Sequence, residues 1–231
     1  MVTLVLLPGL DGTGLLFADF IASLGPEVKT IVASYPSDTP LGYSELEPFA
    51  RSFLPHDQPF YLLAESFSGP IAISIAASSP PGLLGLVLSC SFARNPVPLL
   101  ALFRPAISAV PISAIPTALL SFFVLGRFVS PVLRGALAKS LALVVPSVLH
   151  SRVRAALSID VSALLQRIKV PLLYLRASED RVVPKSSSLL VSSLAPDVKI
   201  AEFSAPHFLL QALPSQAASS VASFMGVRCG L

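Results

Sequence analysis

The sequence predicts an α/β fold: a mostly parallel sheet of about six strands flanked by helices, with one helical, proline-rich insertion. Three observations predict it. Short runs rich in valine, isoleucine and leucine alternate with longer segments of helical or turn-rich pattern. The short runs are almost continuously apolar, which is typical of strands buried on both faces of a parallel sheet. The alternation is interrupted only once, so the 231 residues are expected to form one domain with one insertion.

The strands and helices can be placed by these patterns. The predicted strands are Val2–Leu7, Val28–Ala33, Phe60–Ala64, Leu86–Cys90, Leu172–Arg176 and Val198–Phe203. The predicted helices are Gly14–Leu24, Tyr43–Phe53, Phe67–Ser79, Lys185–Leu194 and Ser215–Met225. Because strands and helices alternate along the chain, we expect a doubly wound sheet with helices on both faces.

The insertion covers residues 91–169 and is expected to be a cap of short helices. It holds many of the 22 prolines of the chain, and their spacing forbids long uninterrupted helices. Because it leaves after one predicted strand and returns to the next, we expect it to lie over the carboxyl ends of the strands. The core domain is then made of residues 1–90 and 170–231.

A stretch within the cap raises the alternative of a membrane span. Residues Pro105 to Gly126 contain no charged residue, and their number meets the length rule for a transmembrane helix. Pro111 and Pro116 make a regular span of this stretch a poor fit, and an apolar lid explains the same residues. An apolar lid is also a surface that lipid binds, so peripheral lipid contact remains an open alternative.

Composition narrows the functional classes. Hydrophobic residues make up 53% of the chain and charged residues 13%, and the net charge of +3 is spread without a basic run. This excludes the electrostatic pattern of a nucleic-acid-binding protein. Cys90 and Cys229 have no framework spacing, so both are expected to be free thiols. The apolar N-terminus lacks a basic leader and is expected to be the first strand, which favours a cytoplasmic location.

The segment Phe60-Tyr-Leu-Leu-Ala-Glu-Ser-Phe-Ser-Gly69 places a serine between a strand and a helix. In a nucleophile elbow, a serine occupies a strained turn of this kind, and the residues two before and two after it must be small. Here those residues are Ala64 and Ser68 rather than the usual glycines. Ser66 is therefore a candidate nucleophile, with a plain structural turn as the alternative.

The first predicted strand runs into a glycine-rich loop, Pro8-Gly-Leu-Asp-Gly-Thr-Gly14. The loop lacks the Gly-Lys-Ser/Thr of a phosphate-binding loop, and its glycines have the wrong spacing for a dinucleotide fingerprint. With the serine turn, it resembles the α/β-hydrolase superfamily, in particular the small carboxylesterases, which commonly have His-Gly-x-x-Gly here. Pro8 replaces that histidine. The resemblance implies that the backbone N–H groups of Leu10 and Phe67 form an oxyanion hole.

A nucleophilic serine needs a base and an acid. Of the three histidines, His207 directly follows the last predicted strand, where ligand-facing residues gather in open α/β sheets. His56 precedes the strand that delivers Ser66, and His150 falls in what is expected to be an ordinary helix surface. Asp180 follows the preceding strand and resembles the family's acid, with Glu179 as its neighbouring rival and a helix N-cap as the structural alternative.

These residues occur in the order serine, aspartate, histidine, which resembles the order of this family. The resemblance implies hydrolysis of a small-molecule carboxylic ester through an acyl-enzyme, without metal or other cofactor. The apolar cap favours an apolar acyl or alcohol group. Four phenylalanines of the cap are expected to contact the substrate or to form the cap's own core: Phe103, Phe122, Phe123 and Phe128. A thioesterase, an acyltransferase and a non-catalytic binding protein on the same fold are the alternatives.

Overall fold

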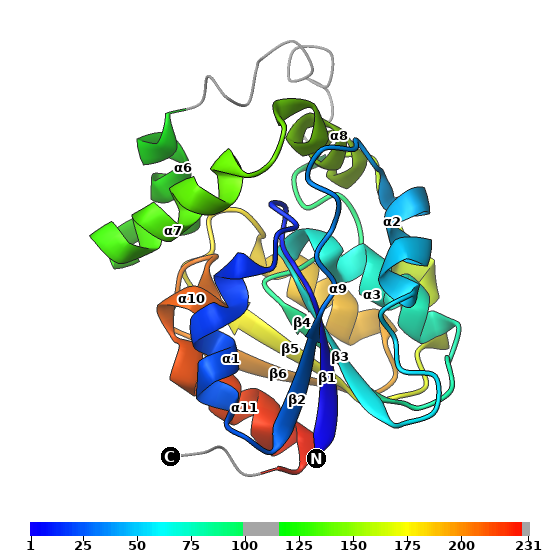
Figure 1. Ribbon diagram of the computed structural model, residues 1–231. Coiled ribbons are helices and arrows are strands. Elements are labelled where there is room, and N and C mark those ends of the chain that lie inside the picture. Colours follow the sequence, from blue (N-terminus) through cyan, green and yellow to red (C-terminus); the bar gives the residue numbers. More distant parts are fainter. Residues whose placement is uncertain (99–115, 228–231) are drawn as a thin grey trace.

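A computed structural model describes residues 1–98 and 116–227 and confirms the α/β fold (Figure 1). Its sheet has six parallel strands in the order β2-β1-β3-β4-β5-β6. Their bounds are β1 Val2–Leu7, β2 Val28–Val32, β3 Phe60–Glu65, β4 Leu83–Ser89, β5 Leu172–Ala177 and β6 Val198–Phe203. All six predicted strands are therefore present.

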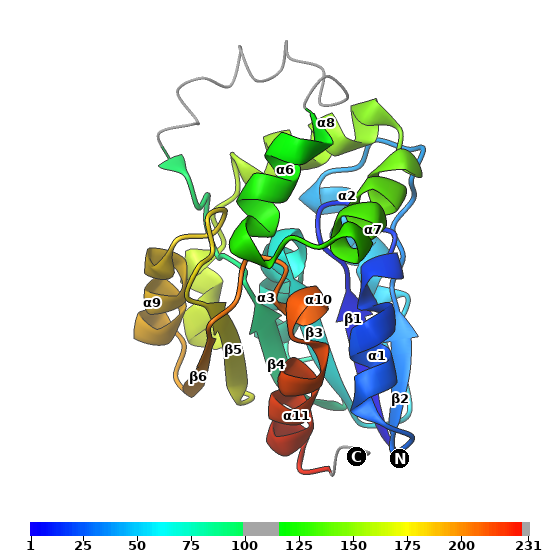
Figure 2. The ribbon, with the colours of Figure 1, turned by 90° about the vertical axis from the view of Figure 1, so that its left-hand side faces the viewer.

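Helices cover both faces of the sheet, as Figures 1 and 2 show. One face carries α1 (Ala18–Leu24), which follows the 3₁₀ helix η1 (Leu15–Phe17), together with α10 (Leu209–Ala212) and α11 (Pro214–Met225). The other face carries α2 (Tyr43–Arg51), α3 (Gly69–Ala77) and α9 (Lys185–Leu194). The 3₁₀ helix η2 (Ser66–Ser68) connects β3 to α3.

Neighbouring residues in the central strands explain their apolar sequence. Leu62 and Leu63 of β3 point to opposite sides of the sheet, because side chains alternate along a strand. Leu62 packs with the α2 and α3 layer and Leu63 with the α1 and α11 layer, and neither is exposed to solvent. Burial on both faces therefore accounts for the continuous apolar runs.

The strand order places the candidate residues at one end of the sheet. The chain adds β2 on one side of β1 and β3 on the other, so a topological switch point lies between β1 and β3. Ligands of open α/β sheets bind at such a point, beyond the carboxyl ends of the strands. Leu7 pairs with Ala64, so the glycine-rich loop and Ser66 leave adjacent strands at the same level.

The described part of the insertion lies mostly above this end of the sheet. It contains α6 (Thr117–Val124), the 3₁₀ helix η4 (Gly126–Phe128), α7 (Pro131–Ala142) and α8 (Pro146–Ala156) (Figure 2). The 3₁₀ helix η5 (Ser162–Arg167) instead contributes Leu165 to the core beside the sheet. The boundaries of core and cap stay a prediction, as does the cytoplasmic location.

No single helix within the described residues is long and apolar enough to span a membrane. The consecutive helices α7 and α8 meet the length and hydropathy criteria only together, and they are bent by 101° at their junction. Half of the charge-free stretch that raised the alternative of a span, residues 105–115, lies outside the described residues.

Candidate active site

Ser66 occupies a strained turn between β3 and α3. Its φ is +47°, a left-handed conformation that is uncommon for residues other than glycine. The hydroxyl of Ser91, just beyond β4, donates to the carbonyl of Ser66 at 2.6 Å and holds the turn. A Cβ at Gly69 would collide with that same hydroxyl, which explains the glycine at this position. The turn thus exposes the Ser66 side chain at the end of the sheet.

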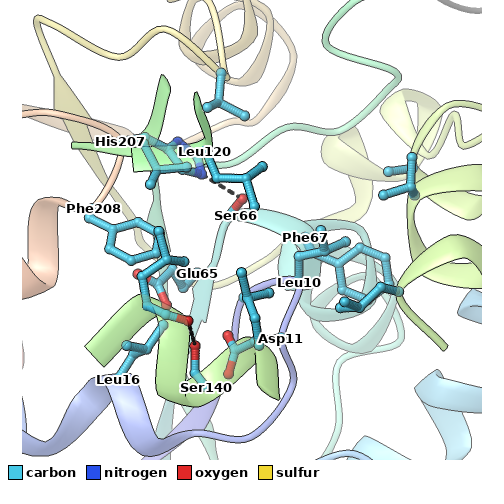
Figure 3. A pocket seen from close by; sticks show the side chains of 18 of the residues that line it. Leu10, Asp11, Leu16, Glu65, Ser66, Phe67, Leu120, Ser140, His207 and Phe208 are labelled. Atoms are coloured by element: carbon cyan, nitrogen blue, oxygen red, sulfur yellow. Dashed lines mark hydrogen bonds between the residues drawn. The ribbon is translucent and has the colours of Figure 1, made fainter. Parts of the chain in front are cut away.

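The hydroxyl of Ser66 lies 2.9 Å from Nε2 of His207 (Figure 3). On the other side of the imidazole ring, Nδ1 lies 2.8 Å from Oδ2 of Asp180. The second carboxylate oxygen of Asp180 accepts the backbone N–H groups of Val182 and Val183, each at 2.8 Å. The three residues that sequence reasoning selected separately therefore form one hydrogen-bonded chain, with the Asp180 carboxylate fixed by its own loop.

The pKa values of the two ionisable groups in this hydrogen-bonded chain, Asp180 and His207, are both shifted. Burial opposes ionisation of Asp180, but His207 and the N–H groups of Val183 and Val182 outweigh it and lower the pKa of the carboxyl group. Burial likewise disfavours the imidazolium of His207, but the charge of Asp180, its hydrogen bond and the charge of Glu65 together raise the pKa of the ring. An ionised Asp180 thus makes His207 a stronger base.

The rival acid and bases lie elsewhere. Glu179 is ion-paired with Arg127 of the cap at 2.5 Å and accepts a hydrogen bond from Ser204. His56 is exposed in the turn before β3, at the opposite end of that strand from Ser66. His150 lies on α8 and is not part of the cavity wall formed by the described residues. Of these candidates, Asp180 and His207 are therefore the two that are hydrogen-bonded to each other, with His207 in contact with Ser66.

The backbone N–H groups of Leu10 and Phe67 have the surroundings expected of an oxyanion hole. Both residues line the cavity beside Ser66 (Figure 3). Within the described residues, neither N–H has a hydrogen-bond acceptor. Phe67 is held from two sides, because the ring of Tyr43 stacks on it at 4.7 Å and the Tyr43 hydroxyl donates to its carbonyl at 2.9 Å.

Ser68 does more than fit the turn, which the sequence did not reveal. Its hydroxyl donates to the carbonyl of Pro8, at the start of the glycine-rich loop, and lies 2.7 Å from the hydroxyl of Tyr35. Ser68 is fully buried. The side chain therefore ties the serine turn to the loop that carries Leu10.

A cavity of about 380 Å³ opens over Ser66, roofed by the cap. The wall is mostly apolar and combines side chains of α6, α7 and α8 and Phe92, at the start of the insertion, with Val182 and Phe208 of the core. The cap contributes Leu120, Val124, Leu137, Leu141, Leu149 and Val153. A small molecule bound in this cavity would lose its contacts with water and would contact apolar side chains, except near Ser66 and a few other polar groups.

The phenylalanines proposed to contact the substrate are not part of the described cavity wall. Phe122, Phe123 and Phe128 are not among the described residues that line it, and Phe103 lies outside the described residues. On α6, Leu120 and Val124 are one turn apart and face the cavity, whereas Phe122 and Phe123 are 56% and 44% exposed. Contact of these exposed rings with lipid stays a prediction.

Glu65 is a buried carboxylic acid in the cavity wall that the sequence reasoning did not single out. Its side chain accepts a hydrogen bond at 2.9 Å from Nε2 of Gln211. Burial raises the pKa of Glu65 to about 7; the hydrogen bond from Gln211 opposes this rise, and the nearby Asp11 carboxylate adds to it. The only signal in the sequence was a charged residue at the end of an apolar strand, next to Ser66.

The coupling of Glu65 to His207 predicts a shift in the pH dependence of catalysis. Because negative charge on Glu65 favours the imidazolium, Glu65→Gln is expected to lower the pKa of His207 and to extend activity toward lower pH. We expect the acid limb of the kcat/KM profile to lie above the usual range of a histidine in the unsubstituted protein, because the pKa of His207 is raised. It should move to lower pH in the variant, measured with p-nitrophenyl butyrate from pH 5 to 9. An acid limb that does not move would contradict this coupling.

One group of side chains within the described residues could hold a metal ion: Cys90, Asp180 and His207, whose ligand atoms lie within 4.8 Å of one another. Two of them, Asp180 and His207, are already hydrogen-bonded to each other. Burial raises the pKa of the Cys90 thiol well above its usual value, which opposes the thiolate that a metal would need. The donor set therefore fits a proton relay better than a metal site. Cys90 is a free thiol, and Cys229 lies outside the described residues.

No protein-family model and no curated protein matches the sequence. Solved structures do match the fold. A hydrolase from Oleispira antarctica has a TM-score of 0.83 at 17% identity, covering 99% of this chain and 92% of its own. An enol-lactonase from Burkholderia xenovorans has a TM-score of 0.84 at 16% identity, covering 97% and 91%. An esterase from Exiguobacterium antarcticum has a TM-score of 0.84 at 14% identity, covering 98% and 92%. At these identities the likeness shows a shared fold.

Proposed function

Starting from the α/β-hydrolase fold that the chain shares with these enzymes, we propose that this protein is a serine hydrolase of carboxylic esters with apolar acyl or alcohol groups. One observation carries the proposal: the hydrogen-bonded chain Ser66, His207 and Asp180 ends in an apolar cavity, beside two backbone N–H groups that have no acceptor among the described residues. A solved enol-lactonase and a solved esterase on the same fold support ester chemistry.

In the proposed mechanism, Nε2 of His207 takes the proton of Ser66 while Oγ attacks the ester carbonyl carbon. The carbonyl oxygen becomes an oxyanion that accepts hydrogen bonds from the N–H groups of Leu10 and Phe67. As the C–O bond breaks, His207 gives its proton to the departing alcohol. Water then attacks the acyl-enzyme, His207 takes its proton, and the carboxylic acid leaves while Ser66 regains its hydrogen.

Asp180 keeps Nδ1 of His207 protonated, so that Nε2 is free to accept the proton of Ser66. The carboxylate also stabilises the imidazolium that forms in each step. Its low pKa keeps Asp180 ionised throughout the range in which His207 titrates. The same groups would serve a thioester, so the bond that is cleaved has to be tested directly.

Chain-length preference tests the proposed substrate class. We expect kcat/KM to rise from p-nitrophenyl acetate to butyrate and octanoate, because each added methylene leaves water for the cavity wall. Val153→Phe narrows the cavity and should reduce kcat/KM for octanoate at least about tenfold more than for acetate. A panel with matched thioesters and amides identifies the preferred bond.

Phe122→Ser is the matched control, because this cap residue is exposed and does not line the cavity. It should leave the chain-length profile unchanged, while its sedimentation with phospholipid vesicles reports on the predicted lipid contact. Equal losses on acetate and octanoate in Val153→Phe would contradict the assignment of the cavity to the acyl chain. Failure of all the esters to react would contradict the proposed function.

A further inference from the structure

Arg152 belongs to the cap helix α8, yet its side chain is fully buried against the core. Its Nη1 donates to the carbonyls of Leu10 at 3.0 Å and Asp11 at 2.7 Å, and its Nη2 donates to the carbonyl of Pro36 at 2.9 Å. Its Nε has no hydrogen-bond partner within the described residues. A buried guanidinium loses its hydration, so carbonyl acceptors in the right places are needed to hold it.

Two of these acceptors belong to the loop that carries the proposed oxyanion donor. Among the described residues, the carbonyls of Leu10 and Asp11 have Arg152 as their hydrogen-bond donor. Other hydrogen bonds of the loop include those from the N–H of Gly12 to the carbonyl of Gly9 at 3.0 Å, from the N–H of Tyr35 to Gly12 at 2.8 Å and from the Ser68 hydroxyl to Pro8. Arg152 thus fixes the peptide plane that directly follows the N–H of Leu10.

The loop is shaped around the guanidinium. Gly12 has a φ of +71°, which favours glycine, and a Cβ there would collide with the guanidinium of Arg152. On another side, the guanidinium lies 5.7 Å from the ring centre of Tyr35, whose hydroxyl reaches Ser68 of the serine turn. Arg152 therefore joins the cap, the glycine-rich loop and the serine turn in one packed unit.

The rest of α8 is attached to the core in the same region. The N–H of Val145, which precedes the helix, donates to the carbonyl of Ser37 at 2.9 Å. The hydroxyl of Ser151 reaches the carbonyl of Leu41 at 3.4 Å. Both of these residues precede Arg152 and bind the loop after β2, so α8 is fixed to that loop as well as, through Arg152, to the loop after β1.

We propose that Arg152 is a positioning residue that holds the Leu10 N–H in line with the reacting carbonyl oxygen, so that the cap helix α8 is part of the oxyanion hole's support. This inference rests on the proposed function. The guanidinium does not touch the substrate; it acts through the two carbonyls that it binds. A displacement of about 1 Å in a positioning group is enough to reduce a rate about a hundredfold.

The experiment compares three variants of the full chain: Arg152→Met, Arg152→Lys and the control Arg154→Met. Arg154 lies two residues further along α8 and is exposed, so its variant removes a charge from the same helix without touching the loop. One readout is amide exchange of the peptide Leu7–Gly14. The other is inhibition by an alkyl trifluoromethyl ketone, which adds to a nucleophilic serine and places an oxyanion in the hole.

We expect Arg152→Met to speed amide exchange in Leu7–Gly14 while leaving β4 and β5 unchanged. It should raise the inhibition constant of the ketone about ten- to a hundredfold, with kcat falling in parallel and KM changing less than about threefold. Arg152→Lys should give values of exchange, inhibition and kcat between those of Arg152→Met and the unsubstituted protein. Its ammonium group keeps the charge but cannot bind all three carbonyls as the planar guanidinium does. Arg154→Met should behave as the unsubstituted protein.

Unchanged amide exchange of Leu7–Gly14 in Arg152→Met would overturn the proposal that Arg152 holds this loop in place. Faster exchange with unchanged kcat and ketone affinity overturns the positioning role and leaves Arg152 a structural residue. If Arg152→Met does not fold, the same comparisons are decided by Arg152→Lys. If the unsubstituted protein neither hydrolyses esters nor binds the ketone, the proposed function fails. Amide exchange of Leu7–Gly14 then decides by itself whether Arg152 holds the loop.

Discussion

Asp180→Asn is expected to reduce kcat/KM for ester hydrolysis by about 10³- to 10⁴-fold while the protein stays folded. The amide oxygen can still accept the N–H groups of Val182 and Val183, so the acid loop keeps its shape. The amide NH₂ group, however, now faces Nδ1 of His207 as a donor. The imidazole then carries its proton on Nε2 and cannot take the proton of Ser66. The measurement is steady-state hydrolysis of p-nitrophenyl butyrate, with a thermal melt of the same sample.

Glu179→Gln is the matched control for this loss. Glu179 is the adjacent carboxylate, but it pairs with Arg127 at the surface, where an ion pair contributes little to stability. We expect its activity to stay within about twofold of the unsubstituted protein. Nearly full activity in Asp180→Asn, with a large loss in Glu179→Gln, would show that the acid is Glu179 and not Asp180.

Ser66→Ala is expected to reduce ester hydrolysis by about 10⁴-fold or more, because it removes the only atom in the proposal that bonds to the acyl group. The φ of +47° at this position is maintained by the surrounding turn, so the fold should persist. Ser68→Ala is not a neutral comparison, since the Ser68 hydroxyl bonds to Pro8 and Tyr35. Ser74→Ala, on α3 and outside the described cavity wall, is the better control and should retain activity. Equal activity of Ser66→Ala and Ser74→Ala would contradict the role of Ser66.

The sheet was predictable because its strands are buried on both faces. A continuous apolar run of about six residues is a strong local signal, and the central strands β1, β3, β4 and β5 occur where such runs stand. The edge strands β2 and β6 carry charged residues and are only partly buried. Helix α9 begins directly after Pro184 and has the predicted bounds, Lys185–Leu194. The predicted boundaries were less accurate where the apolar pattern was weaker. Strand β4, for example, begins three residues earlier than the predicted Leu86.

The hydrogen-bonded chain of Ser66, His207 and Asp180 could be predicted from the sequence because each residue lies in the loop or turn that follows a strand. Parallel strands end at one edge of the sheet, so the topology brings residues that follow different strands together. Local sequence could not separate Asp180 from Glu179, since the choice depends on which way each side chain turns. In the structure the hydrogen bonds to Val182 and Val183 decide that direction.

Arg152 could not be predicted from its own segment, which has the pattern of an ordinary surface helix. Its acceptors, Leu10, Asp11 and Pro36, stand 142, 141 and 116 residues earlier in the chain. They are backbone carbonyls, which every residue has, so the residue types at these positions do not indicate an arginine partner. A buried arginine of this kind becomes visible only when the packing of the cap on the core is known.

The position of the α6 phenylalanines outside the described cavity wall could not be predicted, because composition does not determine which face of a helix points inward. The side chains of Leu120 and Val124 face the cavity, which leaves Phe122 on the opposite side of the helix. An apolar residue in a cap is therefore weak evidence for substrate contact, because a cap has two sides. The exposed backbone carbonyl of Phe122 accepts a hydrogen bond from Arg181 at 3.0 Å, which fixes this helix to the acid loop.

The central claim is that Ser66 is a nucleophile activated by His207, and covalent labelling tests it most directly. A fluorophosphonate bearing an alkyl chain reacts when the serine oxygen bonds to phosphorus and fluoride leaves. Treated protein should gain the mass of one phosphonyl group, with fragment masses locating it on Ser66 in the peptide that contains residues 60–70. Labelling should be lost in Ser66→Ala and slowed strongly in Asp180→Asn. Absence of an adduct on the folded protein, or an adduct on Ser68 or another residue in its place, would contradict the account.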